Sequence, residues 1–245
     1  MLISGSFSTS QAIYRGGAQL LPREFTLRNY EAIFRKPDRI LHAFSVSVFV
    51  TLAGTLVGLL LISMTAYVIS RKDFRFRKFI SFYFYLTTLF NGGMVCTYIF
   101  YIRYYGLKDS FLAIILPNLT QVLYMLILRN FAAQVPSALI ESAKIDGAGE
   151  FYIFLRIVLP LLRSGLATVG LFLALTYWND WYNAMLYIHT EWKYPLQYLL
   201  YRAEKTQSVS SVMAMTCVTM APVLFLYPFV QKYFLQGITL GAIKG

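Results

Sequence analysis

Charged residues are scarce in this chain of 245 residues. Asp, Glu, Lys and Arg make up 13% of it, against about 25% in a typical soluble domain, whereas 58% of its residues are hydrophobic. The only cysteines are Cys96 and Cys217 and the only histidines are His42 and His189, spacings that fit neither a disulfide framework nor a metal site. These absences disfavour a soluble enzyme and a metalloprotein. The clustering of the apolar residues indicates a membrane protein with several spans.

Sequence motifs for catalysis are absent as well. The chain contains no G-x-x-x-x-G-K-[ST] phosphate-binding loop, no His-Glu-x-x-His and no nucleophile elbow. We therefore expect a non-catalytic subunit that binds no cofactor, no metal and no nucleic acid. Ionisable residues are also rare in the middle of the apolar runs, which disfavours an ion-coupled carrier.

Five long apolar runs predict an all-α, polytopic transmembrane helical bundle. Each run is close to the ~20 residues that a helix needs to cross ~30 Å of hydrocarbon. The predicted spans are residues 42–69, 79–102, 111–128, 161–187 and 211–235. Residues 1–41 are expected to form an external segment, and residues 42–245 the transmembrane domain. The short loop at 71–78 carries five basic residues, which favours a cytoplasmic position for it.

The segment 136–160 is charged and broken in a chain that is otherwise apolar. Residues 137–146 are predicted to form a short helix that starts after Pro136, and Gly147-Ala148-Gly149 permits a sharp turn with positive φ. A second short helix, FYIFLRIV, is expected to follow. The pattern predicts a helix–turn–helix outside the bilayer. From the pattern alone, a helix pair resting on lipid headgroups is an equally good interpretation.

The residues of this segment resemble the EAA loop of ATP-binding cassette importer permeases. The family pattern is EAA, three residues, Gly, nine residues, Ile, one residue, Leu-Pro, and here Ser142 replaces the second residue of the motif. The Asp-Gly-Ala triplet resembles that of the carbohydrate-importing, maltose-type class. Segments 22–34, 177–184 and 227–245 extend the resemblance, which is strongest to the branch that imports complex oligosaccharides. The matching positions are Glu141, Ser142, Ala143, Asp146, Gly147, Ala148, Ile157, Leu159 and Pro160.

The resemblance implies a fold of the type I ABC importer permease kind in a bacterial cytoplasmic (inner) membrane. It implies that the EAA loop docks on a cytoplasmic ATPase dimer, which holds ATP and Mg. It further implies a second, homologous permease subunit and an external solute-binding protein. Family members have six spans, so the resemblance places a further span before Leu2. We expect Glu141 and Asp146 to brace the helix pair, and Ala143 and Gly147 to contact the ATPase. The alternative is a non-transporting scaffold or channel-like subunit.

Uncharged polar and aromatic residues within and at the ends of the runs are candidates for a sugar path. They are Asn91, Asn118, Gln121, Tyr124, Tyr177, Trp178, Asn179 and Trp181. Interhelical hydrogen bonding or an interfacial aromatic belt explains them equally well. The predicted external segments hold eleven basic and seven acidic residues, a balance of 11 − 7 = +4. This charge suggests an acidic oligosaccharide of the alginate or pectin kind. Binding of an acidic partner protein, or simple solvation of the loops, is the alternative.

Overall fold

A computed structural model describes residues 1–242 apart from residues 23, 36 and 91, with side chains as far as Phe225. The chain divides into two compact units. The first consists of residues 1–50, 106–114 and 178–228, and the second of residues 51–105, 115–177 and 229–245. Helices form the described parts of both units, and we find no β-strand there beyond an isolated bridge between Ser8 and Phe25. The predicted all-α class is confirmed.

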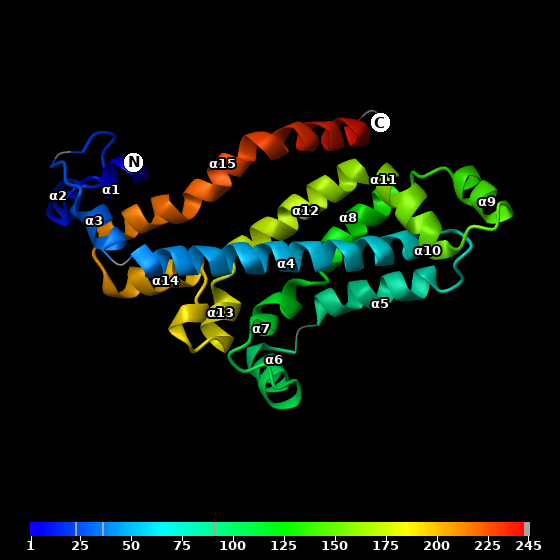
Figure 1. Ribbon diagram of the computed structural model, residues 1–245, viewed down its shortest axis with the longest axis horizontal. Helices are drawn as coiled ribbons and strands as arrows, with labels where there is room; N and C mark the ends of the chain where they lie inside the picture. Colours follow the sequence, from blue (N-terminus) through cyan, green and yellow to red (C-terminus); the bar gives the residue numbers. More distant parts are fainter. Residues whose placement is uncertain (23, 36, 91, 243–245) are drawn as a thin grey trace. The chain divides into compact units, whose positions relative to one another are not determined.

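Two long helices, α4 and α15, run through both units (Figure 1). The first unit also holds α1 (Leu2–Ser6), α2 (Ser10–Gly16), α3 (Arg28–Phe34), α13 (Tyr182–Tyr187), the 3₁₀ turn Glu191–Lys193 and α14 (Leu196–Thr206). The second holds α5 (Arg77–Leu89), α6 (Met94–Ile99), α8 (Val122–Ala132), α9 (Ser137–Ile145), α10 (Glu150–Ile153), α11 (Leu159–Leu161) and α12 (Arg163–Trp178). Helix α7 (Phe111–Ile115) lies where the chain passes from one unit to the other.

Helix α4 (Pro37–Ser70) has 34 residues and a mean hydropathy of 2.3 over its most apolar window. At 1.5 Å per residue it is about 50 Å long, more than the ~30 Å of a hydrocarbon core. Among the described residues, it is the one unbroken helix that is long and apolar enough to cross a membrane. Helix α15 (Val209–Ala242) contains the predicted span 211–235, and its stretch Val209–Phe225 is an apolar helix.

Three further candidate spans are bent pairs of helices. In the pair Phe111–Asn118 and Val122–Ala132 the bend is 51°, and in the pair Glu150–Leu161 and Arg163–Trp178 it is 84°. The third pair joins α5 to Met94–Tyr104, whose last five residues form a π-helical turn. Each pair is apolar enough to count as one broken span. The five-span topology stays a prediction.

Three predicted spans are not the continuous helices that their apolar runs suggested, and the bend in the run 111–128 is given above. The run 79–102 is divided between α5 and α6, and Gly93 at the start of α6 has a φ of 80°. The run 161–187 ends as a helix at Trp178. The carboxylate of Asp180 then accepts a hydrogen bond from the main-chain N–H of Asn183 (3.0 Å), which satisfies a donor in the first turn of α13.

In the second unit, α12 packs closely against α4 at glycine positions. A Cβ placed on Gly54 would lie 2.4 Å from Cζ of Tyr177. The Tyr177 hydroxyl donates to the main-chain oxygen of Ile115 (2.8 Å). Gly165 has the same relation to Phe131 of α8, with 2.7 Å to the ring. The absence of a side chain at these positions allows the helices to approach closely, as is common in membrane bundles.

Hydrogen bonds of one buried amide connect three helices of the first unit. The amide of Asn29 donates to the main-chain oxygens of Ser6 (2.9 Å) and Ser8 (3.2 Å), and its oxygen accepts from Ser210 (3.2 Å). This set of bonds joins α1, α3 and the start of α15. Because Asn29 is buried, its amide needs these partners to offset the loss of water.

Candidate coupling site

The predicted helix–turn–helix is present and is built around Gly147. Helix α9 begins after Pro136 and ends at Ile145, and Gly147 follows with a φ of 79°. The N–H of Gly147 bonds to the oxygen of Lys144 (3.0 Å), and the N–H of Ala148 to the oxygen of Ala143 (2.9 Å). This pair of bonds is the Schellman motif, which favours glycine because the left-handed conformation is strained for other residues.

The second helix begins at once after this turn. Gly149 has an ordinary extended conformation, with a φ of −70°, and precedes α10. The chain then continues through a π-helical turn, Phe154–Val158, into α11. The predicted second helix is therefore confirmed, although it widens into a π-helical turn in its second half.

A hydrophobic cluster fixes the helix pair to the rest of the second unit. Its buried members are Tyr67, Ala132, Ala143, Ile153, Phe154, Val158 and Leu162, with Ile140, Ala148, Ile157 and Leu159 packed against them. Four of the family-matched residues thus face the subunit's own core. Ala143 is only 9% exposed. Its methyl group packs within the chain's own hydrophobic cluster, and its contact with an ATPase stays a prediction.

The outer side of the pair combines polar and apolar groups. Glu141, Ser142, Asp146 and Pro160 are exposed, and so is the turn at Gly147. Ile145 beside the turn is 86% exposed, and Phe151 and Tyr152 are 60% and 59% exposed. An exposed apolar group at the tip of a charged hairpin suits a contact with another protein.

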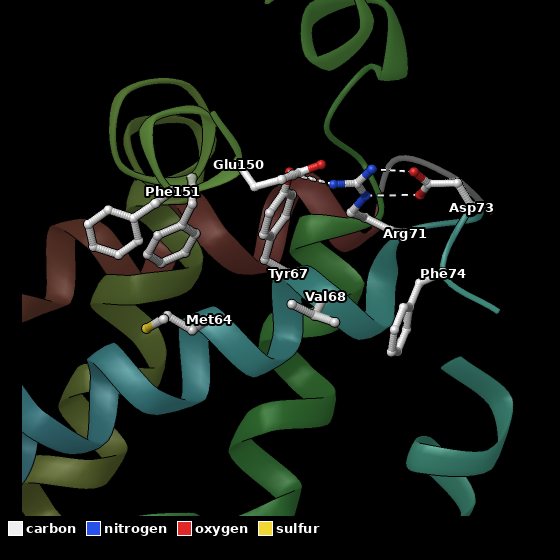
Figure 2. Close-up of a pocket in the computed structure, with 9 residues that line it drawn as sticks. Met64, Tyr67, Val68, Arg71, Asp73, Phe74, Glu150 and Phe151 are labelled. Carbon is white, nitrogen blue, oxygen red and sulfur yellow. Dashed lines mark hydrogen bonds and ion pairs between the residues drawn. The ribbon is translucent and has the colours of Figure 1, made fainter. Parts of the chain in front are cut away.

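Four charged residues form a cluster beside the turn of the hairpin, which we call the hinge cluster: Arg71, Asp73, Lys144 and Glu150. The guanidinium of Arg71 donates to both carboxylates and lies between them, as Figure 2 shows. Nζ of Lys144 lies 3.0 Å from Oε1 of Glu150 and 3.6 Å from Oδ2 of Asp73. The cluster thus joins α9, α10 and the loop that follows α4.

The cluster is held charged at neutral pH by its own geometry. The hydrogen bond from Arg71 lowers the pKa of Asp73 to about 2. Arg71 also lowers the pKa of Glu150, with a smaller contribution from Lys144 in the same direction. The hydrogen bond to Asp73 in turn raises the pKa of the Arg71 guanidinium. Arg71 is the least accessible member, with a side chain 15% exposed, so it has the most to lose from an unpaired charge.

A pocket of about 460 Å³ opens beside the hinge cluster. Met64 and Val68 of α4 and Phe74 of the following loop supply its apolar wall, and Phe151 and Phe154 supply the wall from the hairpin (Figure 2). Tyr67 stands below Glu150, with its hydroxyl 3.4 Å from that carboxylate. The end of α4 and the hairpin are therefore connected by packing as well as by charge.

The predicted sugar-path residues of the second unit that the structure describes have partners within the protein. Tyr177 is buried against Gly54, as described above. The Tyr124 hydroxyl lies 2.9 Å from that of Thr176, and the amide of Gln121 donates to Asn118 (3.0 Å). Asn118 and Gln121 lie at the bend between the halves of one candidate span. Their bond is local, whereas the contact between Tyr124 and Thr176 joins two helices, and a contact of any of these residues with sugar stays a prediction.

In the first unit, Trp178 is buried, and its indole N–H donates to the oxygen of Thr219 (3.3 Å). Asn179 is exposed and accepts from the amide of Gln197 (3.2 Å). Trp181 is 36% exposed and stacks on Tyr201, with ring centroids 4.2 Å apart. Asn91 lies outside the described residues. Trp178 is thus buried while Asn179 and Trp181 are accessible, and a contact of these residues with sugar stays a prediction.

The sequence-based prediction missed the hinge cluster, although it noted the basic loop at 71–78. The informative signal was Asp73, the one acidic residue in that loop. Arg71 and Glu150 are separated by 79 positions, so their contact depends on the packing of α10 beside the end of α4.

Comparisons with known proteins agree with this geometry. Residues 58–240 match the family described as binding-protein-dependent transport system inner membrane component. The polygalacturonan/rhamnogalacturonan transport system permease protein YtcP of Bacillus subtilis (strain 168) is 40% identical over 261 aligned positions, which cover 100% of this chain and 91% of that protein. The arabinooligosaccharides transport system permease protein AraQ of Halalkalibacterium halodurans is 27% identical, in an alignment that covers 100% of this chain and 89% of that protein.

A solved structure is similar as well. It is the crystal structure of a bacterial ABC transporter involved in the import of the acidic polysaccharide alginate. One of its chains matches with a TM-score of 0.82 and 28% sequence identity, over 95% of this chain and 88% of that chain. The similarity therefore extends over nearly the whole chain.

Proposed function

The chain belongs to the family of binding-protein-dependent transport system inner membrane components, and we propose that it is the permease subunit of an ATP-driven importer of acidic oligosaccharides. The observation that carries the proposal is the hairpin α9–α10, with its Schellman turn at Gly147 and its hinge cluster. A chain without a phosphate-binding loop needs a partner to supply ATP and Mg, and the exposed tip of this hairpin offers the surface for that partner.

The hairpin belongs on the cytoplasmic side of a bacterial inner membrane, where an ATPase dimer has its nucleotide. The basic loop at 71–78 is next to the hairpin, in agreement with the excess of Lys and Arg in cytoplasmic loops. Because α4 is longer than the bilayer core, its start at Pro37 then belongs outside. The bent helix pairs would complete a multi-pass bundle together with a second, homologous permease subunit.

The mechanism follows from how the hairpin is held. When ATP closes the ATPase dimer, a docked hairpin is displaced with it. The hydrophobic cluster and the hinge cluster connect the hairpin to α4, α8 and α12. The displacement is therefore passed to whole helices, because packed interiors move as rigid pieces. Two permease subunits that tilt in this way would alternate between an inward-open and an outward-open path, and an external solute-binding protein would deliver the sugar.

Two observations support an acidic oligosaccharide as the substrate class. One relative is named for transport of polygalacturonan/rhamnogalacturonan, and the solved structure for import of the acidic polysaccharide alginate. In addition, the proposed external segments carry a balance of +4. A positive entrance raises the local concentration of an anionic ligand. A scaffold without transport would have no use for a hairpin that is both braced and exposed.

The test uses the assembled complex of this chain with its second permease, ATPase and binding protein in lipid nanodiscs. ATPase activity should rise when the binding protein carries a uronate trisaccharide and should stay near its basal level with a neutral trisaccharide of equal length. Stimulation by the neutral sugar alone would refute the acidic substrate class. Stimulation that is unchanged in a Gly147→Pro complex would refute coupling through the hairpin.

A further inference from the structure

A second pocket, of about 350 Å³, lies in the first unit. Helix α3, the start of α4 and helix α14 lie beside one another (Figure 1), and residues of all three line it. Its volume is within the range of ~300–1,000 Å³ that is common for small-molecule sites. Its described lining residues include three arginines, Arg35, Arg39 and Arg202, and no acidic residue.

We propose that this pocket, which we call the arginine pocket, binds a uronate unit of the transported oligosaccharide on the external side. The inference rests on the proposed function, which places the start of α4 outside the membrane. The arginines would hold the carboxylate, because a guanidinium matches a carboxylate with two parallel hydrogen bonds. Thr206 and Gln207 would meet the ring hydroxyls, and both are exposed on the pocket's rim.

The arginines come from different elements, so their convergence is a property of the fold. Arg35 follows the last turn of α3, Arg39 is in the first turn of α4 and Arg202 is in α14. Arg202 is held over the ring of Tyr194, with its guanidinium carbon 5.3 Å from the ring centroid. Apolar groups, among them Ile33 and Leu199, line the rest of the pocket and suit the C–H face of a sugar ring.

One carboxylate of the protein, that of Glu191, already forms ion pairs with two of these arginines. Oε1 of Glu191 lies 3.7 Å from Arg39 and 3.5 Å from Arg202. The side chains of the two arginines remain 48% and 44% exposed, and that of Glu191 is 66% exposed. Such exposed pairs are weak. A uronate carboxylate entering the pocket would therefore displace Glu191 at little cost and would satisfy the arginines more completely.

The binding test uses the nanodisc complex without its binding protein and a fluorescent trigalacturonate as the probe. Wild type should bind it, and affinity should fall as salt is raised, because the recognition is electrostatic. Combining Arg39→Gln with Arg202→Gln should weaken binding roughly tenfold, the loss expected for removing charged hydrogen bonds. Arg28→Gln is the matched control, since Arg28 is an exposed arginine of α3 that is not among the lining residues.

A second variant is expected to bind trigalacturonate more tightly, a result that misfolding would not produce. Glu191→Gln removes the carboxylate that competes for Arg39 and Arg202, so it should tighten trigalacturonate binding by about threefold at low salt. Equal or weaker binding in Glu191→Gln would contradict the proposal, as would unchanged binding in the double arginine variant. Binding of neutral maltotriose should not respond to any of these substitutions.

The last part of the experiment distinguishes a sugar ligand of the arginine pocket from a protein ligand. Carboxylates on the binding protein present the same chemistry, so docking of the sugar-free binding protein is measured with each variant. If docking weakens while trigalacturonate binding is unchanged, the arginines recognise the protein and the proposal fails. If the wild-type complex is stimulated by uronates but the arginine variants change nothing, the arginine pocket is refuted and the proposed function stands. If no uronate stimulates the complex, the substrate class itself is refuted.

Discussion

Lys144 and Glu150 form an ion pair across the turn of the hairpin α9–α10, with Nζ of Lys144 3.0 Å from Oε1 of Glu150. Lys144 is in the last turn of α9 and Glu150 in the first turn of α10. Each charge is therefore also placed favourably for the dipole of its own helix. The pair bridges the two helices beside the turn, and Arg71 connects the hairpin to the end of α4.

Removing Arg71 should uncouple ATP hydrolysis from transport. Arg71→Gln leaves Asp73 and Glu150 with Lys144 as the one cation that they still share among the described residues, so the hairpin loses its ion pair with Arg71 at the end of α4. We expect substrate transport per ATP hydrolysed to fall about tenfold, while the complex still assembles. The ratio is measured in proteoliposomes by sugar uptake and phosphate release.

Lys72→Gln is the matched control for this substitution. Lys72 is the exposed neighbour of Arg71 and adds the same charge to the loop without appearing among the ion pairs of the hinge cluster. Its removal should leave the ratio close to wild type. An equal loss in both variants would mean that the loop's net charge, and not the cluster, matters.

The turn at Gly147 should be intolerant of substitution, in contrast to Gly149. At Gly147 a φ of 79° is strained for alanine by about 1–2 kcal/mol, and proline would also remove the N–H that bonds to Lys144. At Gly149 the φ of −70° suits any residue. We expect Gly147→Ala to impair stimulated ATPase activity, Gly147→Pro to abolish it, and Gly149→Ala to be near wild type.

The two glycines also show what the sequence could and could not predict. Gly147 was predictable because a glycine after a helical stretch marks a Schellman turn, which depends on neighbouring residues alone. The hinge cluster was not, because Arg71 and Glu150 are 79 positions apart and meet through the packing of α10 beside α4. The end of α12 was also not predictable from composition, because the apolar run continues after Trp178. In the structure Asp180 instead starts a new helix.

The contact between Gly54 and Tyr177 should be sensitive to a single methyl group. The Cβ of Gly54→Ala would lie 2.4 Å from the Tyr177 ring, which must then move or separate α4 from α12. We expect a loss of about 1–3 kcal/mol from this overpacking. Tyr177→Phe removes only the bond to Ile115 and should cost about 1 kcal/mol. Thermal unfolding in detergent compares the two, and equal midpoints would contradict the close packing.

Asp109 should stabilise the first unit across the physiological pH range. Its carboxylate accepts from the N–H groups of His189 (2.9 Å) and Thr190 (3.0 Å), and Nζ of Lys193 lies 2.9 Å away. Burial raises the pKa of Asp109, but the bonds from Lys193, Thr190 and His189 outweigh it and hold the pKa well below the usual 3.8. The stabilisation is therefore fully present above about pH 4 and declines as the pH falls from there toward the lowered pKa.

Asp109→Asn should remove most of this stabilisation at neutral pH, since an amide cannot pair with Lys193 as a carboxylate does. We expect a cost of about 1–3 kcal/mol, seen as faster proteolysis of the 188–195 segment. Wild type at pH 3 should begin to resemble the variant at pH 7. Equal resistance of this segment to proteolysis in wild type and in Asp109→Asn would show that the Asp109 carboxylate does not stabilise it.

The orientation of the chain can be tested by labelling single cysteines. Cys96 is exposed and Cys217 half-buried, so both are first replaced by serine. Cysteines placed at Glu204 and Lys108, which are exposed, should react with a membrane-impermeant maleimide in intact cells. Cysteines at Lys72 and Glu150 should react only after permeabilisation, because the proposed function puts the hinge cluster on the cytoplasmic side. Labelling of Glu150 from outside would reverse the topology, and with it both the docking of the hairpin on an ATPase and the external position of the arginine pocket.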